Sequence, residues 1–232
     1  MIVGDSNAML SDVERHERGL DTLLRIGGPG AAAPLTALND IAPDLVRFAI
    51  DFAYGEVLSR PRLDLKMRQL CTVAALSAMG TATPQLKWHI DGALNVGLQP
   101  SDVLDALLLS AVNTGSAAIG CSLSVARDVF ETRGAGADAL AALDDACARW
   151  CEIPPVFESL ELDDRTKAMI SIAALTAVAN APARLKAHLR AALDTGASRD
   201  QVIEVIEQMA VYAGFPAALN AIAAARDVFE GR

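Results

Sequence analysis

The chain contains a long internal repeat. Residues 63–131 recur at 162–230, 99 positions later and without a gap, and the two segments are identical at 24 of 69 positions. The shared residues include Leu63 and Leu162, His89 and His188, Gly97 and Gly196, and the run 126–131, which returns as 225–230. A fixed long period indicates that one supersecondary unit is used more than once. Because there are two copies, we expect a pseudo-symmetric pair of helical domains instead of a solenoid.

The composition favours helices. Hydrophobic residues make up 52% of the 232 residues, which is enough for a real core, whereas aromatic residues make up 4%. Strands are enriched in aromatic and β-branched residues, so a β-rich architecture is not expected. The predicted fold class is all-α, with two tandem helical-bundle domains at 1–133 and 134–232 that are related by a pseudo-two-fold axis.

Charge and segment composition narrow the classes of partner. The net charge of −9 argues against non-specific nucleic-acid binding, which needs a basic surface. No uninterrupted apolar run reaches the roughly 18 residues of a membrane span, and 1–6 lack the basic start of a signal peptide. We therefore expect a cytoplasmic protein that binds neither nucleic acid nor membrane.

The cysteines and histidines form no recognisable metal motif. Cys71, Cys121, Cys147 and Cys151 make no CxxC pair, and no histidine lies near enough in sequence to complete a zinc site. Packed, reduced thiols are the favoured interpretation, although Cys147 and Cys151 would share one helix face and could form a dithiol. No metal site is predicted.

Each copy is predicted to contain four helices. An Asp N-cap starts the first helix, and glycines or Asn mark the later ends. These boundaries are Asp64, Gly80, Gly97 and Gly115 in copy one and Asp163, Asn180, Gly196 and Gly214 in copy two. The third helix starts with Pro100 at its first position in copy one and with a capping box, Ser198 to Gln201, in copy two.

The segments outside the repeat are also predicted to be helical. Glu14–Arg25 and Pro43–Leu58 precede copy one and are separated by a break at 27–30. Glycines at 134 and 136 mark a linker, and Ala137–Cys151 is the expected helix before copy two.

The repeated histidine is the first candidate for chemistry. His89 lies on an apolar helix stripe between Leu86 and Ala93, and His188 lies between Leu185 and Ala192 in the same way. One interpretation is a hydrogen-bonded histidine at the edge of a core, which duplication would copy as readily as a functional residue. The other is a general acid or base near neutral pH, with His188 as a possible second site.

The stretch before copy one is the second candidate. Glu56 follows Gly55 near a helix end, and Arg60 and Arg68 lie close in sequence. A guanidinium could bind a substrate carboxylate through two parallel hydrogen bonds. The alternative is an exposed charge cluster. Copy two has prolines at the positions of Gly55 and Glu56, so this feature is not duplicated. Trp88 and Tyr212 are each consistent with a pocket wall, a core or an interface.

These motifs resemble the carboxymuconolactone decarboxylase family of small all-helical proteins. The similarity runs through 17–20, 54–56, 60–70, 74–76 and 86–97. Copy one with its N-terminal arm resembles a full family domain, whereas copy two resembles the helical core alone. The resemblance implies two domains of the alkyl hydroperoxidase D-like type, at 1–133 and, in degenerate form, at 134–232.

The family has a peroxidase-like and a decarboxylase-like branch, and the resemblance favours the second. The peroxidase-like branch uses a CxxC pair that ends four residues before the histidine, where this chain has Ala82 and Gln85. The acidic residue of the first core helix is also replaced, by Gln69. The decarboxylase-like branch needs no cofactor. By resemblance, His89 and Glu56 are the catalytic residues, and Arg60, Arg68, Tyr54 and Trp88 bind substrate.

The resulting hypothesis is a cofactor-free acid/base enzyme acting on a small carboxylated lactone or keto acid, by decarboxylation or a related cyclisation or isomerisation. A thiol-dependent redox protein and a non-catalytic scaffold are the alternatives. Because family members assemble as rings of single-copy subunits, the resemblance also implies a homo-oligomer, a trimer or dimer of fused chains.

Overall fold

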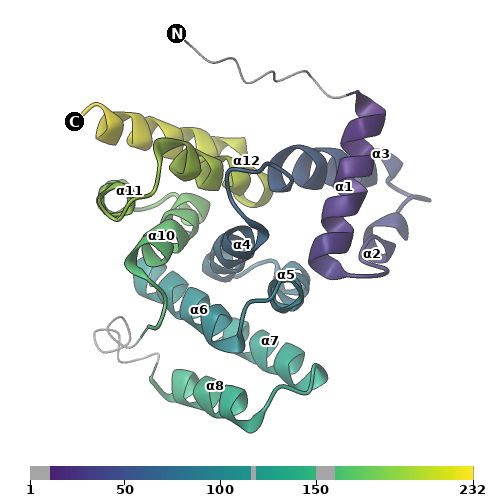
Figure 1. The fold of residues 1–232 in the computed structure, drawn as a ribbon, viewed down its shortest axis with the longest axis horizontal. Helices are drawn as coiled ribbons and strands as arrows, with labels where there is room; N and C mark the ends of the chain where they lie inside the picture. Colours follow the sequence, from purple (N-terminus) through teal and green to yellow (C-terminus); the bar gives the residue numbers. More distant parts are fainter. Residues whose placement is uncertain (1–10, 116–118, 150–159, 232) are drawn as a thin grey trace. The chain divides into compact units, whose positions relative to one another are not determined.

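A computed structural model describes residues 11–115, 119–149 and 160–231, and within these ranges it contains helices and no strands (Figure 1). The prediction of an all-α fold is confirmed. The helices are α1 (Asp12–Gly27), α2 (Ala33–Thr36), α3 (Pro43–Phe48), η1 (Ala49–Leu58), α4 (Leu65–Met79), α5 (Thr83–Asn95), α6 (Pro100–Thr114), α7 (Ile119–Thr132), α8 (Ala137–Arg149), α10 (Asp164–Val178), α11 (Pro182–Asp194) and α12 (Arg199–Phe229).

The chain forms two compact units, Met1–Arg60 and Pro61–Arg232. This division differs from the predicted domains 1–133 and 134–232, because both copies of the repeat lie in the second unit. Their first helices, α4 and α10, make the most extensive helix contact of the structure. The two copies therefore pack directly against each other through these helices, and each copy has its own core.

The contact between α4 and α10 explains the many alanines of these two helices. Cys71 and Ala75 of α4 pack into the core of copy two, and Ile170 and Ala174 of α10 pack into that of copy one. The small side chains of Cys71, Ala75 and Ala174 let the two backbones approach closely, and all four residues are fully buried. The predicted pseudo-symmetric pairing is thus built by an exchange between equivalent helices.

The helix ends follow the predicted pattern closely. Asp64 Oδ1 accepts a hydrogen bond from Met67 N at 2.8 Å, and Asp163 Oδ1 accepts one from Thr166 N at 3.0 Å. Gly97 and Gly196 have positive φ values of 89° and 93°, which explains why glycine stands there. Helix α10 ends at Val178, slightly before the expected Asn180.

Gly214 divides α12 as predicted. Its φ and ψ of 82° and 166° are not helical, so two helical segments meet there. Helix α12 is long and apolar enough to cross a membrane, but 44% of its most apolar window is buried inside the protein. Core helices of globular proteins meet the same criterion, and α12 packs on α10 and α11.

The first unit is built around a close crossing of α1 with η1. A Cβ on Gly19 would lie 2.4 Å from Ile50 O, and a Cβ on Gly55 would lie 2.3 Å from Arg15 O. No real Cβ can approach a carbonyl oxygen so closely, so both positions require glycine. The predicted helix 43–58 is a six-residue α-helix, α3, that continues as the π-helix η1.

Candidate functional site

His89 lies in the interior of the second unit. Helix α5 directs Leu86, Ile90 and Ala93 into the core of copy one, and His89 shares this buried side with 3% of its surface exposed. The Trp88 ring meets the imidazole edge to face at a centroid distance of 4.8 Å. The apolar stripe read from the sequence therefore carries a buried imidazole.

Both ring nitrogens of His89 have a polar neighbour. Nδ1 lies 2.9 Å from Gln69 Oε1, and Nε2 lies 3.4 Å from the Tyr212 hydroxyl. Burial lowers the pKa of His89 to about 3, so the ring is neutral at pH 7. A neutral imidazole donates from one nitrogen and accepts at the other. Because Gln69 Oε1 can only accept, Nδ1 carries the proton and Nε2 accepts from Tyr212.

The hydrogen bonds continue beyond Tyr212. Thr72 Oγ1 donates to the Tyr212 hydroxyl at 3.2 Å, and Gln208 Nε2 donates to Thr72 Oγ1 at 2.8 Å. All donors in this series, which we call the His89 chain (Gln208, Thr72, Tyr212, His89 and Gln69), point the same way. Burial raises the pKa of Tyr212, which keeps its hydroxyl protonated as a donor.

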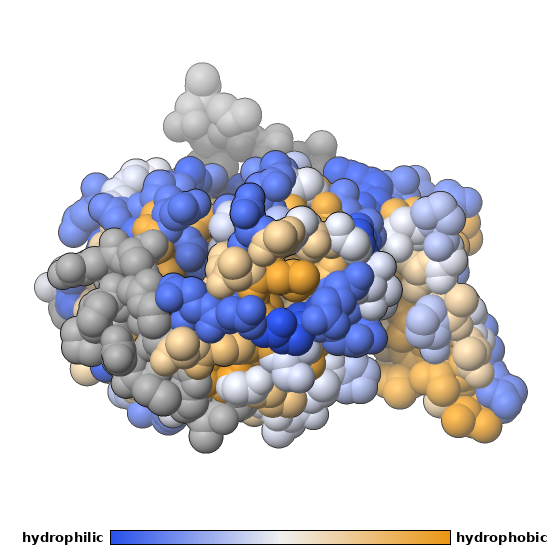
Figure 2. Space-filling model, turned by 90° about the horizontal axis from the view of Figure 1, so that it is seen from below, coloured by the Kyte–Doolittle hydropathy of each residue, from blue (hydrophilic) through white to orange (hydrophobic). Residues whose placement is uncertain are grey.

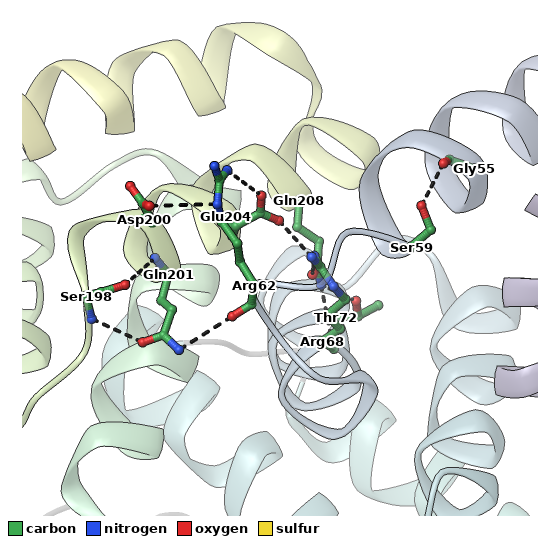
Figure 3. A network of polar contacts seen from close by, with 10 residues as sticks. All are labelled: Gly55, Ser59, Arg62, Arg68, Thr72, Ser198, Asp200, Gln201, Glu204 and Gln208. Atoms are coloured by element: carbon green, nitrogen blue, oxygen red, sulfur yellow. Dashed lines mark hydrogen bonds and ion pairs between the residues drawn. The ribbon is translucent and has the colours of Figure 1, made fainter. Parts of the chain in front are cut away.

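A buried ion pair holds the far end of the His89 chain (Figure 3). Arg68 donates to Gln208 Oε1 at 3.1 Å and to Glu204 Oε2 at 2.7 Å. Arg62 donates to the other oxygen of Glu204 at 3.4 Å. Arg68 is 0% exposed and Glu204 is 1% exposed, so each charge depends on the other for compensation. The guanidinium of Arg68, predicted to bind substrate, is therefore occupied by protein groups.

The His89 chain joins the two copies. His89, Gln69 and Thr72 belong to copy one, whereas Gln208 and Tyr212 come from α12 of copy two. The sequence did not single out Gln208, Glu204 or Thr72. A signal was present, since 204, 208 and 212 lie four residues apart and therefore on one face of a helix.

Among the residues that the structure describes, no arrangement equivalent to the His89 chain surrounds His188 in copy two. The position of Gln69 is occupied by Ala168, and that of Tyr212 by Asn113, which donates to Ser171 Oγ at 2.7 Å instead. His188 is half-buried, and burial together with the nearby Arg184 charge lowers its pKa. The histidine is thus duplicated, but the side chains that orient His89 are not.

The remaining predicted residues lie in the first unit. Arg15 Nε donates to Glu56 Oε1 at 2.6 Å, and Tyr54 and Arg60 are half-buried. His16, which the sequence did not single out, has Nδ1 2.7 Å from Asp51 Oδ1. These contacts tie α1 to η1 beside the glycine crossing.

The described cysteines have different environments. Cys71 is fully buried, and burial raises the pKa of its thiol to about 12, which makes it a poor nucleophile. Cys121 and Cys147 are exposed, and Cys151 lies outside the described residues. Within the described ranges no three His, Cys, Asp or Glu side chains are grouped as a metal site would need.

Comparison with known proteins gives matches over both copies. The model of the carboxymuconolactone decarboxylase family matches residues 43–128 and 156–227. The 4-carboxymuconolactone decarboxylase of Acinetobacter baylyi is 30% identical over 126 residues, which are 54% of this chain and 93% of that protein. An uncharacterized 15.0 kDa protein of Paracoccus denitrificans is 35% identical over 97 residues, 41% of this chain and 72% of its own length. Peroxisomal protein 2 of Schizosaccharomyces pombe is 28% identical over 96 residues, 41% of this chain and 45% of its own.

Proposed function

Because this chain belongs to the carboxymuconolactone decarboxylase family, we propose that it is a cofactor-free acid/base enzyme. Its substrate is a small carboxylated lactone or keto acid, and its reaction is a decarboxylation or a related cyclisation or isomerisation. The relative from Acinetobacter baylyi, named as a 4-carboxymuconolactone decarboxylase, supports this class of substrate.

Decarboxylation of such a substrate can proceed without a cofactor, because the substrate's own carbonyl accepts the electron pair. The bond between the carboxylate and the adjacent carbon breaks, carbon dioxide leaves, and the electron pair enters the conjugated carbonyl as an enolate. The enzyme has to orient the carboxylate, stabilise the enolate oxygen and deliver one proton to carbon. A positioned imidazole can carry that proton.

The observation that carries the proposal is the single direction of the His89 chain. Each hydroxyl in it donates toward Nε2 of His89, and the Arg68 guanidinium polarises the series from its far end. A substrate anion beside the ring would raise the imidazole pKa from its low resting value. Substrate binding would thereby make His89 able to take up and return a proton.

A second feature beside His89 supports an active role. Gln69 Nε2 is buried and has no hydrogen-bond partner within the described parts of the chain. An unsatisfied buried donor is costly unless a ligand or water uses it. We assign it to a substrate oxygen, which would lie next to the imidazole that Gln69 orients.

For the other residues we propose the roles that the family resemblance implies. Glu56 is the second proton carrier, and Tyr54, Arg60 and Trp88 bind substrate. Arg68 acts first on Gln208 and Glu204, and would contact substrate only if that ion pair opened.

The test is carbon dioxide release from 4-carboxymuconolactone, a carboxylated unsaturated lactone, with and without substitution of the imidazole. His89→Gln is expected to lower kcat at least about a hundredfold, the contribution of a positioned acid or base. His188→Gln is the matched control, from the same repeat position, and is expected to retain turnover. Equal loss in both variants, or full activity of His89→Gln, would refute the assignment.

We also propose a cytoplasmic homo-oligomer, a trimer or dimer of fused chains. Apolar side chains gather on the surface of the part that carries α1–α3 (Figure 2). Ile41, Leu45 and Phe48 are 76%, 62% and 57% exposed there, which is unusual for large apolar residues in water. Light scattering of the purified chain tests the oligomer, and a monodisperse monomer would contradict it.

A further inference from the structure

Copy two contains a cavity that is separate from the His89 chain. It has a volume of about 250 Å³ and lies between the end of α10, the start of α11 and the second segment of α12. It is lined by Leu175, Thr176, Ala181, Pro182, Asn220 and Ala221, with four further small or apolar residues. None of these residues takes part in the His89 chain, so the proposed reaction leaves the cavity unexplained.

Thr176 is one of the residues that line this cavity, and it carries a polar group without a partner. The residue is 1% exposed, and its Oγ1 has no hydrogen-bond partner within the described parts of the chain. A buried hydroxyl in this state has lost its water without gaining a protein partner. A ligand oxygen in the cavity would supply what is missing.

The equivalent position in copy one shows how such a hydroxyl is otherwise satisfied. Ser77 corresponds to Thr176, and its Oγ donates to Ser122 Oγ at 2.9 Å. The counterpart of Ser122 in copy two is Ala221, which has no polar side-chain atom and lines the cavity. The same exchange of serine for alanine thus removes the partner of Thr176 and adds space in front of it.

The chemistry of the wall determines the class of ligand. No lining residue is charged, and most are alanine, leucine or proline, so a charge held against this wall would find no partner among the lining side chains. Thr176 and Asn220 are the polar side chains. An apolar cavity of about 150 Å³ holds one benzene molecule, so 250 Å³ accommodates a ring with a substituent.

We propose that this cavity binds a small uncharged ring compound with one hydroxyl or carbonyl oxygen, and that this oxygen hydrogen-bonds to Thr176. All the residues that line the site belong to copy two, and the site is independent of the acid/base chemistry at His89. The second copy would then retain a binding role although its histidine lacks the partners of His89.

Titration calorimetry of the full chain with phenol tests the proposal, with benzoate as the charged ring of similar size. Saturable phenol binding is expected, with benzoate at least about tenfold weaker because its carboxylate would be buried unpaired. Ala221→Leu should abolish phenol binding by filling the cavity. Thr176→Val keeps the shape of the side chain and should weaken phenol about fivefold, the worth of one hydrogen bond.

Two further measurements make the outcome decisive. Toluene lacks the oxygen, so its affinity should be the same in the native chain and in Thr176→Val. His89→Gln should bind phenol normally, which separates this site from the proposed reaction. Absence of saturable phenol binding, or phenol binding that Ala221→Leu leaves unchanged, would overturn the proposal.

Discussion

The buried neutral state of His89 has a measurable consequence for stability. Burial lowers its pKa from 6.5 to about 3, so below pH 6.5 the unfolded chain binds a proton at this residue that the folded chain does not. The unfolded state is therefore favoured progressively as the pH falls from 6.5 toward 3. Replacing His89 with glutamine, which keeps hydrogen-bonding capacity but does not titrate, should remove this part of the pH dependence.

The magnitude follows from the two pKa values. For a single proton, the difference between 6.5 and about 3 destabilises the native chain by about 2.5 kcal/mol between pH 7.0 and pH 4.5. All titratable groups except His89 are present in both proteins. Their contributions to the pH dependence therefore cancel when one profile is subtracted from the other. The predicted difference is large compared with the uncertainty of a denaturant midpoint.

Urea unfolding at pH 7.0, 6.0, 5.0 and 4.5 provides the measurement. The native chain should lose about 2.5 kcal/mol more than His89→Gln over this range. His188→Gln serves as the control. Because His188 is only half-buried, the pH profile of this variant should differ less from the native profile than that of His89→Gln does. Parallel profiles for the native chain and His89→Gln would show that the imidazole is not held neutral by burial, and the hydrogen-bond assignment at Nδ1 and Nε2 would fall with it.

Three further predictions concern the ion pair, the glycine crossing and the hydroxyl next to His89. Arg68→Met leaves the Glu204 carboxylate buried without its nearest cation and should lower the free energy of unfolding by about 3 kcal/mol. The double variant Arg68→Met, Glu204→Met should regain most of this free energy. Equal losses for the single and the double variant in urea unfolding would contradict the reasoning. Gly19→Ala forces a Cβ against a carbonyl oxygen 2.4 Å away and should cost about 1–3 kcal/mol. Gly120→Ala should cost nothing, because beyond its chain neighbours and the adjacent backbone of its own helix no described atom lies within 4 Å of the added Cβ. Tyr212→Phe should lower kcat about tenfold or more with unchanged circular dichroism, and full turnover would remove Tyr212 from the mechanism.

Local features of the fold were readable from the sequence because they depend on nearby residues. The Asp N-caps at 64 and 163 and the glycines at 97 and 196 mark helix ends through hydrogen bonds and φ angles within a few positions. The π-helical form of η1 was not readable, because nothing in 49–58 distinguishes it from an α-helix. The close packing of Gly19 and Gly55 against the other helix was also invisible, since it depends on a partner segment.

The candidate site was likewise only partly predictable from the sequence. The repeat alone identified His89 and His188 as equivalent and indicated that the first copy retains more of the family's motifs. It did not show that Tyr212 of copy two would approach His89 of copy one, over 123 positions of sequence. That contact exists because α4 and α10 pack together through small residues and bring α12 against α4.

The sequence by itself determined the all-α fold class, most helix ends, the repeat and the family. The tertiary structure decided which histidine has oriented partners, which arginine is occupied by a carboxylate and which threonine is left without a partner. The physical reason is range: helix propensity and capping act within a few residues, whereas desolvation and hydrogen bonding at a site depend on side chains that only packing brings together.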